Sequence, residues 1–205
     1  MKKFNHCILC NGSNFRIIHQ KDHWQYLRCL NCDLVSLYPR PSQQELMSNY
    51  RDYLPIQPKE IEAWEIMMKP VIVKSANLIE SRVRAGSERL LDIGCGYGYF
   101  LKEMKSRGWM VEGIEISQTG RQYAQDKWNI RVHSQPLEDL NIPENSFEVI
   151  TLFYVIEHVL DPLSLLMEMK RVIKPGGLIL LRWPHSTPIV RMLGPLARKL
   201  DLYHT

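Results

Sequence analysis

The chain has 205 residues, of which 45% are hydrophobic, and its formal net charge at pH 7 is +4. This length supports one α/β core with a small extra module, and the weak charge argues against a nucleic-acid partner. No apolar run approaches the roughly 20 residues that cross a bilayer, so we expect no membrane span.

Two Cys-x-x-Cys pairs stand near the amino end, with eighteen residues between them. Each pair places two thiolates on one tight turn, and two turns supply the four ligands of a structural zinc site. Disulfide bonds are the main alternative. Because no charged and apolar leader precedes the first pair, we expect a cytoplasmic protein with reduced thiols. We predict a zinc ribbon over residues 1–40, with Zn²⁺ bound by Cys7, Cys10, Cys29 and Cys32.

Residues 41–87 are predicted to form a helical connector. Ser42 suits the N-cap of a helix that extends to about Tyr50. A longer helix is expected over about Lys59–Arg84, with a kink at Pro70. We expect its apolar face to pack on the sheet and to help close a ligand cleft. That face holds Ile61, Trp64, Met68, Val71, Ser75, Leu78 and Arg82.

The segment Leu90–Leu101 reads LLDIGCGYGYFL, an apolar strand followed by glycines at alternate positions and then a helix. Glycines permit positive φ and the close approach of a ligand, and the helix start offers free N–H groups. A dinucleotide fingerprint would need glycine at position 99, where Tyr99 stands. The pattern therefore favours a nucleoside cofactor without a pyrophosphate; an ordinary glycine-rich turn is the alternative.

The following segments have the order of a Rossmann-like, doubly wound α/β domain with a mostly parallel sheet, expected over residues 88–205. Glu115 ends the second strand, 23 residues after Asp92 and near the spacing of about 20 typical of a ribose-binding acid. A solvated carboxylate is the alternative. The expected strands are Met110–Ile116, Ile130–His133, Phe147–Phe153 and Gly177–Trp183, and a helix over Pro162–Ile173 ends at Lys-Pro-Gly-Gly.

The Asp-x-Gly-x-Gly-x-Gly loop, the Glu-His segment and the Lys-Pro-Gly-Gly run resemble class I S-adenosylmethionine (SAM) methyltransferases, over Leu90–Pro184. The resemblance implies a loop that cradles the methionine part of SAM. It also implies an acid near the adenine amino group, for which Gln135, Glu138 and Asp139 are candidates. Cys95 is expected to be a small neighbour of SAM rather than a nucleophile. The predicted cofactor contacts are Asp92, Gly94, Cys95, Gly96, Gly98, Glu115, Gln135, Leu137 and Phe153.

His158 follows the fourth strand at the carboxyl edge of the sheet, where ligands bind in open α/β folds. It is our candidate catalytic base; a helix-capping or supporting histidine is the alternative. Some relatives bind a metal through Glu-x-x-Glu-His, but Tyr154 replaces the first ligand, so we expect no catalytic metal. Tyr50 and Tyr53 precede the long helix. In similar zinc-ribbon methyltransferases such residues lie near the active site, and simple aromatic packing is an equal alternative.

The resemblance predicts SAM-dependent methyl transfer to a small molecule, with a nucleotide-linked sugar or a surface-glycan precursor as the leading acceptor by analogy. An RNA methyltransferase ranks lower because few basic residues lie between the cysteine pairs. A non-catalytic SAM-binding or partner-binding module is a further alternative. An amphipathic helix is expected over Ile189–Leu200. Because no hairpin pattern follows Pro184, we expect a fragment of a longer methyltransferase.

Overall fold

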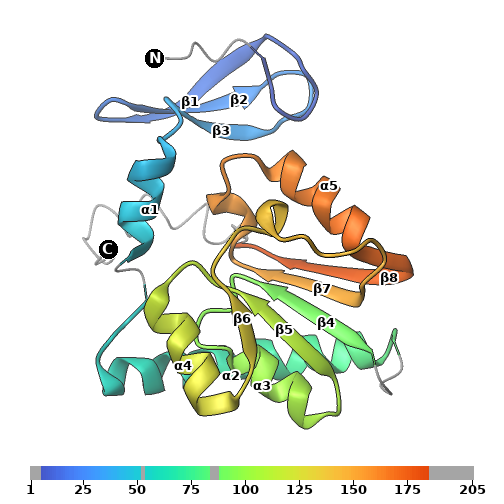
Figure 1. Ribbon diagram of the computed structural model, residues 1–205. Coiled ribbons are helices and arrows are strands. Elements are labelled where there is room, and N and C mark those ends of the chain that lie inside the picture. Colours follow the sequence, from blue (N-terminus) through green and yellow to red (C-terminus); the bar gives the residue numbers. More distant parts are fainter. Residues whose placement is uncertain (1–5, 52–53, 84–87, 185–205) are drawn as a thin grey trace.

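The computed structural model describes residues 6–51, 54–83 and 88–184. Three antiparallel strands, in the order β1-β2-β3, form the amino-terminal module (Figure 1). Asp22, at a φ of +52°, lies in the two-residue turn that pairs Lys21 with Trp24. The strands are β1 (Phe15–Lys21), β2 (Trp24–Cys29) and β3 (Val35–Tyr38).

Helix α1 (Gln43–Arg51) leads from this module toward the rest of the chain (Figure 1). The predicted cap at Ser42 is confirmed. Its hydroxyl accepts a hydrogen bond from the Glu45 N–H at 3.2 Å, and the Glu45 carboxylate accepts one from the Ser42 N–H at 2.7 Å. This reciprocal capping box satisfies N–H groups that the first turn of the helix leaves without partners.

Helix α2 (Pro58–Glu80) continues through Pro70 and ends four residues before the predicted Arg84. Its expected apolar face is partly wrong. The side chain of Leu78 is 43% exposed, whereas Ile72 and Ile79 are buried. Buried positions follow the spacing i, i+3, i+4 and i+7, because the second half of α2 packs against α3 and the sheet. The buried residues of this half are Ile72, Ser75, Ala76 and Ile79.

Five parallel strands in the order β6-β5-β4-β7-β8 form the central sheet. This order confirms the predicted Rossmann-like fold and places the switch in strand order beside β4. The strands are β4 (Arg89–Ile93), β5 (Met110–Ile114), β6 (Arg131–His133), β7 (Phe147–Phe153) and β8 (Ile173–Arg182).

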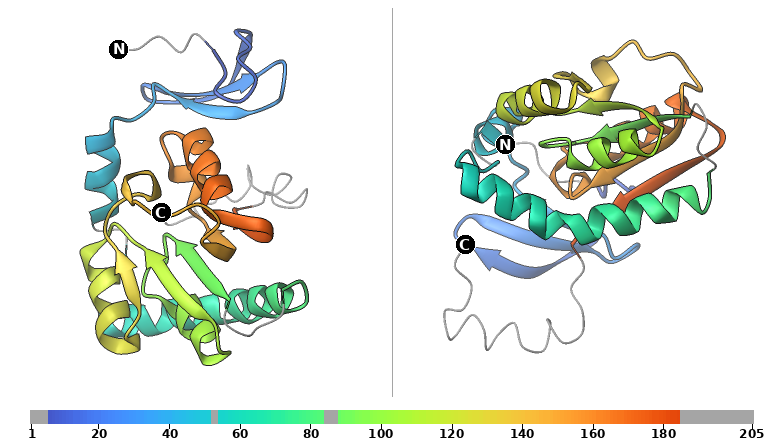
Figure 2. Two further views of the ribbon diagram at one scale, coloured as in Figure 1. Left: turned by 45° about the vertical axis from the view of Figure 1, so that its right-hand side comes forward. Right: turned by 90° about the horizontal axis from the view of Figure 1, so that it is seen from below.

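Two hydrophobic clusters occupy opposite faces of this sheet. On one face, side chains from α2, α3 (Tyr99–Ser106) and α4 (Gln118–Trp128) pack with Leu90 and Val149. On the other, α5 (Pro162–Val172) and the short helix η1 (Leu137–Asp139) pack with Leu91 and Ile150. Figure 2 shows α2 running along one side of the sheet. Because all five strands are parallel, the loops that follow them lie at the same edge of the sheet.

The predicted helix Pro162–Ile173 is confirmed to within one residue, because α5 ends at Val172, just before the Lys-Pro-Gly-Gly run. The predicted strand Gly177–Trp183 begins earlier, at Ile173, so the run lies inside β8, where pairing shifts between Phe147–Ile173 and Val149–Leu178. Gly176 takes a φ of +78° in this bulge, which suits glycine. The predicted helix Ile189–Leu200, the residue Tyr53 and the side chain of Tyr50 lie outside the described residues. The boundaries 1–40, 41–87 and 88–205 remain predictions.

Candidate active site

The glycine loop after β4 has two kinds of glycine. Gly94 and Gly98 adopt φ values of +73° and +74°, and an added Cβ would lie 2.3 Å from Val155 and 2.8 Å from Ala124, respectively. Gly96 has a φ of +54°, but its nearest protein neighbour would be Leu54 at 3.8 Å. The missing side chain of Gly96 therefore leaves space at the surface of the loop, whereas the other two glycines permit internal packing.

Asp92, near the end of β4, is buried and accepts a hydrogen bond from the Thr151 hydroxyl at 2.6 Å. Its register neighbours on the adjacent strands are Gly113 and Thr151. Burial is the main cause that raises the pKa of Asp92 to about 7; the charge of Glu115 adds to the shift and the Thr151 bond opposes it. A cationic ligand group would stabilise the ionised form.

Glu115 follows β5 and holds two loops together. Its carboxylate accepts hydrogen bonds from the N–H of Gly96 at 2.8 Å and from the N–H of Ser117 at 2.7 Å. Burial raises its pKa, while these N–H groups and the positive charge of Arg121 oppose the increase. The two carboxylate oxygens have remaining lone pairs that can accept from hydroxyl groups.

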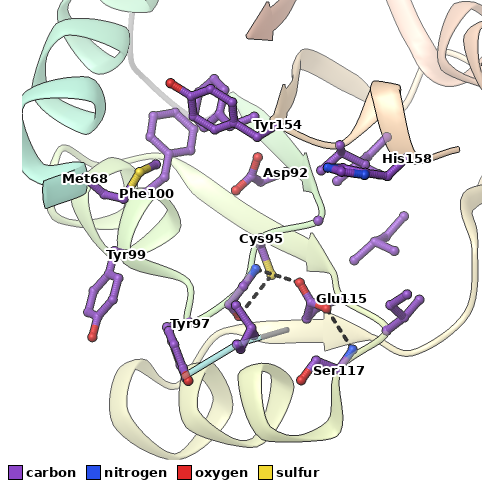
Figure 3. A pocket seen from close by; sticks show the side chains of 18 of the residues that line it. Met68, Asp92, Cys95, Tyr97, Tyr99, Phe100, Glu115, Ser117, Tyr154 and His158 are labelled. Atoms are coloured by element: carbon purple, nitrogen blue, oxygen red, sulfur yellow. Dashed lines mark hydrogen bonds between the residues drawn. The ribbon is translucent and has the colours of Figure 1, made fainter. Parts of the chain in front are cut away.

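A cavity of about 640 Å³ opens at the carboxyl edge of the sheet, within the usual size of small-ligand sites. Figure 3 shows Asp92, Cys95 and Glu115 in this cavity, together with Tyr154 and His158. The structure brings most predicted cofactor residues to it: Asp92, Gly94, Cys95, Gly96, Glu115, Leu137 and Phe153.

Two predicted cofactor residues do not line the cavity. Gly98 faces Ala124 of α4, and Gln135 is exposed to solvent. Of the candidates for the adenine contact, only Glu138 lies on the cavity wall. The position of Gln135 depends on the path of the loop after β6, which spacing alone did not fix.

His158 ends the short helix η2 (Ile156–His158), which begins three residues after β7. It lines the cavity, its side chain is 42% exposed, and its Nε2 lies 4.0 Å from the Glu157 carboxylate. Tyr154 precedes this helix at a φ of +60°, a left-handed conformation that costs about 1–2 kcal/mol for a residue with a Cβ. The segment after β7 therefore presents two polar side chains, Tyr154 and His158, to the cavity, and Tyr154 does so from a strained backbone position.

The four cysteines of the amino-terminal module form a second candidate site. Their sulfur atoms lie within 4.8 Å of one another, with 3.6 Å between Cys7 and Cys32 and between Cys10 and Cys29. Tetrahedral zinc with bonds of about 2.3 Å separates thiolates by about 3.8 Å, whereas a disulfide requires about 2.05 Å. The donor set therefore fits a closed structural metal site.

Backbone groups around Cys29 favour a thiolate. Burial opposes ionisation of this thiol, but the N–H groups of Asn31 and Cys32 lower its pKa to about 7. Such N–H donors belong to the tight turn of the Cys-x-x-Cys pair. Against the backbone N–H groups that oppose the increase, burial and the neighbouring thiols raise the pKa of Cys10 and Cys32, so ionisation is favoured at one sulfur of the cluster.

A family model described as a methyltransferase domain matches residues 23–205. The chain belongs to this methyltransferase family. A ubiquinone biosynthesis O-methyltransferase from Coxiella burnetii is 30% identical over 116 residues, which cover 54% of this chain and 48% of that protein. The protein of the same name from Pseudomonas fluorescens is 34% identical over 108 residues, 49% and 46% of the two chains.

Among solved structures, a SAM-dependent methyltransferase from Leishmania major superposes with a TM-score of 0.56 at 18% identity, covering 67% of this chain and 59% of that one. This likeness supports the fold alone. The chain spans about half the length of the curated relatives it matches. None of the helices in the described part of the chain has the length and apolarity that a bilayer span requires.

The expectation that the long helix helps to close a ligand cleft is confirmed, because Trp64, Met68 and Val71 of α2 line the cavity. Sequence reasoning missed other parts of the wall. Leu54, which precedes α2, and Met67, within α2, line it from the connector, and Phe100 and Tyr154 line it from the core. Tyr97 lies beneath the loop, and its hydroxyl donates to the carbonyl of Pro55. The sequence could have indicated Tyr154, because this residue occupies the position of a metal ligand in some relatives. The places of Leu54, Met67 and Phe100 in the wall depend on how α2 packs.

Proposed function

We propose that this methyltransferase transfers a methyl group from SAM to a small-molecule acceptor. The observation that carries the proposal is the hydrogen bond between Glu115 and Gly96 beside the cavity, at the switch in strand order. This bond holds Glu115, after β5, and Gly96, after β4, side by side in the cavity wall. The residues around it offer a fit for a nucleoside that carries an amino acid.

Three groups of this chain would hold SAM. The space beside Gly96 admits the methionine part, since no protein atom would lie within 3.4 Å of an added Cβ. Glu115 retains lone pairs for ribose hydroxyls, and Asp92 offers a buried carboxylate for a positive charge. When bound, SAM supplies an electrophilic methyl group on a positively charged sulfur.

We propose His158 as the residue that accepts the proton of the acceptor. It lines the cavity from the turn after β7, and Asp92 lies between it and Phe100 (Figure 3). The Glu157 carboxylate, 4.0 Å away, would stabilise the imidazolium that forms. The cavity wall aligns the two reactants, which supplies the rest of the rate enhancement.

We also propose that Zn²⁺ occupies the four-cysteine site and stabilises the ribbon without taking part in catalysis. Four thiolates fill the tetrahedral shell and leave no open position. The described cysteines form no disulfide, which fits the reducing cytoplasm, the compartment that we propose.

Calorimetric titration tests the cofactor assignment. We expect S-adenosylhomocysteine to bind the full chain and NAD to give no heat, because position 99 holds tyrosine rather than the glycine of a dinucleotide loop. Binding of NAD without binding of S-adenosylhomocysteine would contradict the proposal. The nucleotide-linked sugar or surface-glycan precursor expected from resemblance remains a prediction about the acceptor.

A further inference from the structure

Asp92 and Thr151 form a buried pair between two neighbouring strands of the sheet. They are register partners on β4 and β7, and Thr151 has no exposed surface. The Thr151 hydroxyl lies 2.6 Å from Oδ1 of Asp92 but 3.5 Å from the carbonyl oxygen of Leu91. Because a hydroxyl has a single proton and the shorter distance gives the stronger bond, Thr151 donates this proton to the Asp92 carboxylate.

The two oxygens of the Asp92 carboxylate have different surroundings. Oδ1 accepts the hydrogen bond from Thr151, whereas Oδ2 has no hydrogen-bond donor among the residues that the structure describes. Asp92 also lines the cavity, on the wall where we propose that SAM binds. The bond at Oδ1 restricts the rotation of the carboxylate and leaves the lone pairs of Oδ2 for a ligand.

The surroundings of Asp92 disfavour its negative charge. Figure 3 shows four other titratable side chains around it, from the segments after β4, β5 and β7: Cys95, Glu115, Tyr154 and His158. Burial is the main cause that raises the pKa of Asp92, and the charge of Glu115 adds to the increase. Burial likewise raises the pKa of the Cys95 thiol, which therefore stays neutral. The bond from Thr151 opposes the increase at Asp92, because it stabilises the ionised carboxylate.

We propose that Thr151 is a positioning residue for the methyl donor: its hydroxyl holds the Asp92 carboxylate in place and stabilises its negative charge. This inference rests on the proposed function. Thr151 itself touches no ligand and acts through Asp92. With the hydroxyl present, the positive charges of SAM meet a carboxylate that is already ionised and oriented. Without it, Asp92 keeps its proton to a higher pH, and SAM must displace that proton in order to bind.

Two substitutions at position 151 separate the hydroxyl from the space that the side chain fills. Thr151→Val replaces the hydroxyl with a methyl group of nearly the same size, and valine suits a buried strand. Thr151→Ser keeps the hydroxyl and removes a methyl group instead. Both chains should fold, because Asp92 can take up a proton when its partner is lost, and melting temperatures check this. Thr151→Val in an Asp92→Asn chain is the third variant, since no carboxylate remains there for the hydroxyl to stabilise.

The experiment measures the affinity of the full chain for SAM by calorimetry at pH 6.5 and pH 8.5. Thr151→Val should weaken SAM by about tenfold at pH 6.5, a usual effect of one lost hydrogen bond to a charged group. At pH 8.5 Asp92 is largely ionised in both chains, so the loss should be below about twofold. Thr151→Ser should stay within about twofold at both pH values. Comparison of chains at the same pH cancels the titration of SAM itself.

The outcomes separate this inference from the proposed function. Absence of SAM binding by the unsubstituted chain overturns the proposed function, and the role of Thr151 with it. If the unsubstituted chain binds SAM, an unchanged affinity in Thr151→Val at both pH values overturns the role of Thr151 alone. Equal losses at pH 6.5 and pH 8.5 would overturn it too, because they indicate a distorted cavity. So would a tenfold loss at pH 6.5 that Thr151→Val still causes in the Asp92→Asn chain.

Discussion

The Glu115 carboxylate accepts a hydrogen bond from the backbone N–H of Gly96 across 2.8 Å. This bond joins the end of β5 to the loop after β4, and the second oxygen of Glu115 binds the Ser117 N–H at the start of α4. One carboxylate therefore links the loop after β4 to the start of α4. Such preorganisation reduces the ordering that a ligand must impose when it binds.

Substitution of Gly96 tests the open side of this loop. Gly96→Val should weaken S-adenosylhomocysteine by at least about a hundredfold, equivalent to about 2.7 kcal/mol, because the side chain enters the space proposed for the cofactor. Gly108→Val is the matched control, since Gly108 also has a positive φ, +92°, and nothing within 4 Å of an added Cβ. Similar melting temperatures with lost binding only in Gly96→Val are expected. Equal binding by both variants would remove Gly96 from the cofactor site.

The affinity for SAM should increase with pH around neutrality. The unliganded Asp92 has a pKa of about 7, mainly through burial, and its ionised form attracts the positive charges of SAM. Binding therefore releases a proton, and affinity should increase by about tenfold from pH 6 to pH 8. The raised pKa of Glu115 acts in the same direction. Calorimetry at three pH values measures how the affinity for SAM depends on pH, and Asp92→Asn should reduce this dependence. An unchanged dependence in Asp92→Asn would show that another group releases the proton.

The same shift affects stability with the opposite sign. Asp92 keeps its proton in the folded state up to about pH 7, whereas its unfolded value is 3.8. The folded state thus binds more protons between these values, and the contribution of Asp92 to stability decreases as pH rises through this window. Asp92→Asn should therefore raise the melting temperature more at pH 8 than at pH 5. A constant difference across this range would argue against the shift.

The cysteine site should hold one zinc ion per chain. Cys29→Ser removes one of four ligands, so metal content and the melting temperature of the ribbon should both decrease. Cys95→Ser is the control, because Cys95 is a buried cysteine outside the cluster. Elemental analysis of reduced protein decides the matter. Zinc-free protein with a folded ribbon would refute the assignment.

Replacement of His158 separates catalysis from binding. His158→Ala should leave the affinity for S-adenosylhomocysteine nearly unchanged but slow methyl transfer by about 10²- to 10⁴-fold, the usual effect of a positioned proton acceptor. His19→Ala, at an exposed position in β1, should retain both properties. Transfer of the labelled methyl group from SAM to the acceptor provides the measurement. Full turnover in His158→Ala would show that the proton of the acceptor passes to solvent or to another residue.

Patterns that depend on neighbours in the chain were sufficient for much of the fold. Phe147–Phe153 was predicted with its observed bounds, because a β-branched and aromatic run buried on both faces has few alternatives. The spacing within the two Cys-x-x-Cys pairs likewise predicted that the four sulfur atoms lie close together. Expectations were wrong where tertiary packing determines which residues are buried. Ile79 is buried and Leu78 exposed because Ile79 lies in the cluster that α2 forms with α3 and the sheet.

The candidate site was only half predictable for the same reason. Asp92 lies near the end of β4 and Glu115 follows β5, and the carboxyl ends of these neighbouring parallel strands meet at one edge, so their proximity follows from the order of the elements. Gly98 belongs to the same motif, yet it packs against Ala124 and lies outside the cavity. Leu54 and Met67 reach the cavity from a connector whose path depends on long-range contacts. No local pattern encodes that path.

The strand order β6-β5-β4-β7-β8 also has a consequence for how specificity can change. The residues proposed for SAM lie at the ends of β4 and β5, whereas His158, the proposed proton acceptor, follows β7. The two proposed roles therefore belong to different segments of the chain. We expect exchange of the Tyr154–His158 turn with that of another member of the fold to alter methyl transfer while the proposed SAM site stays intact.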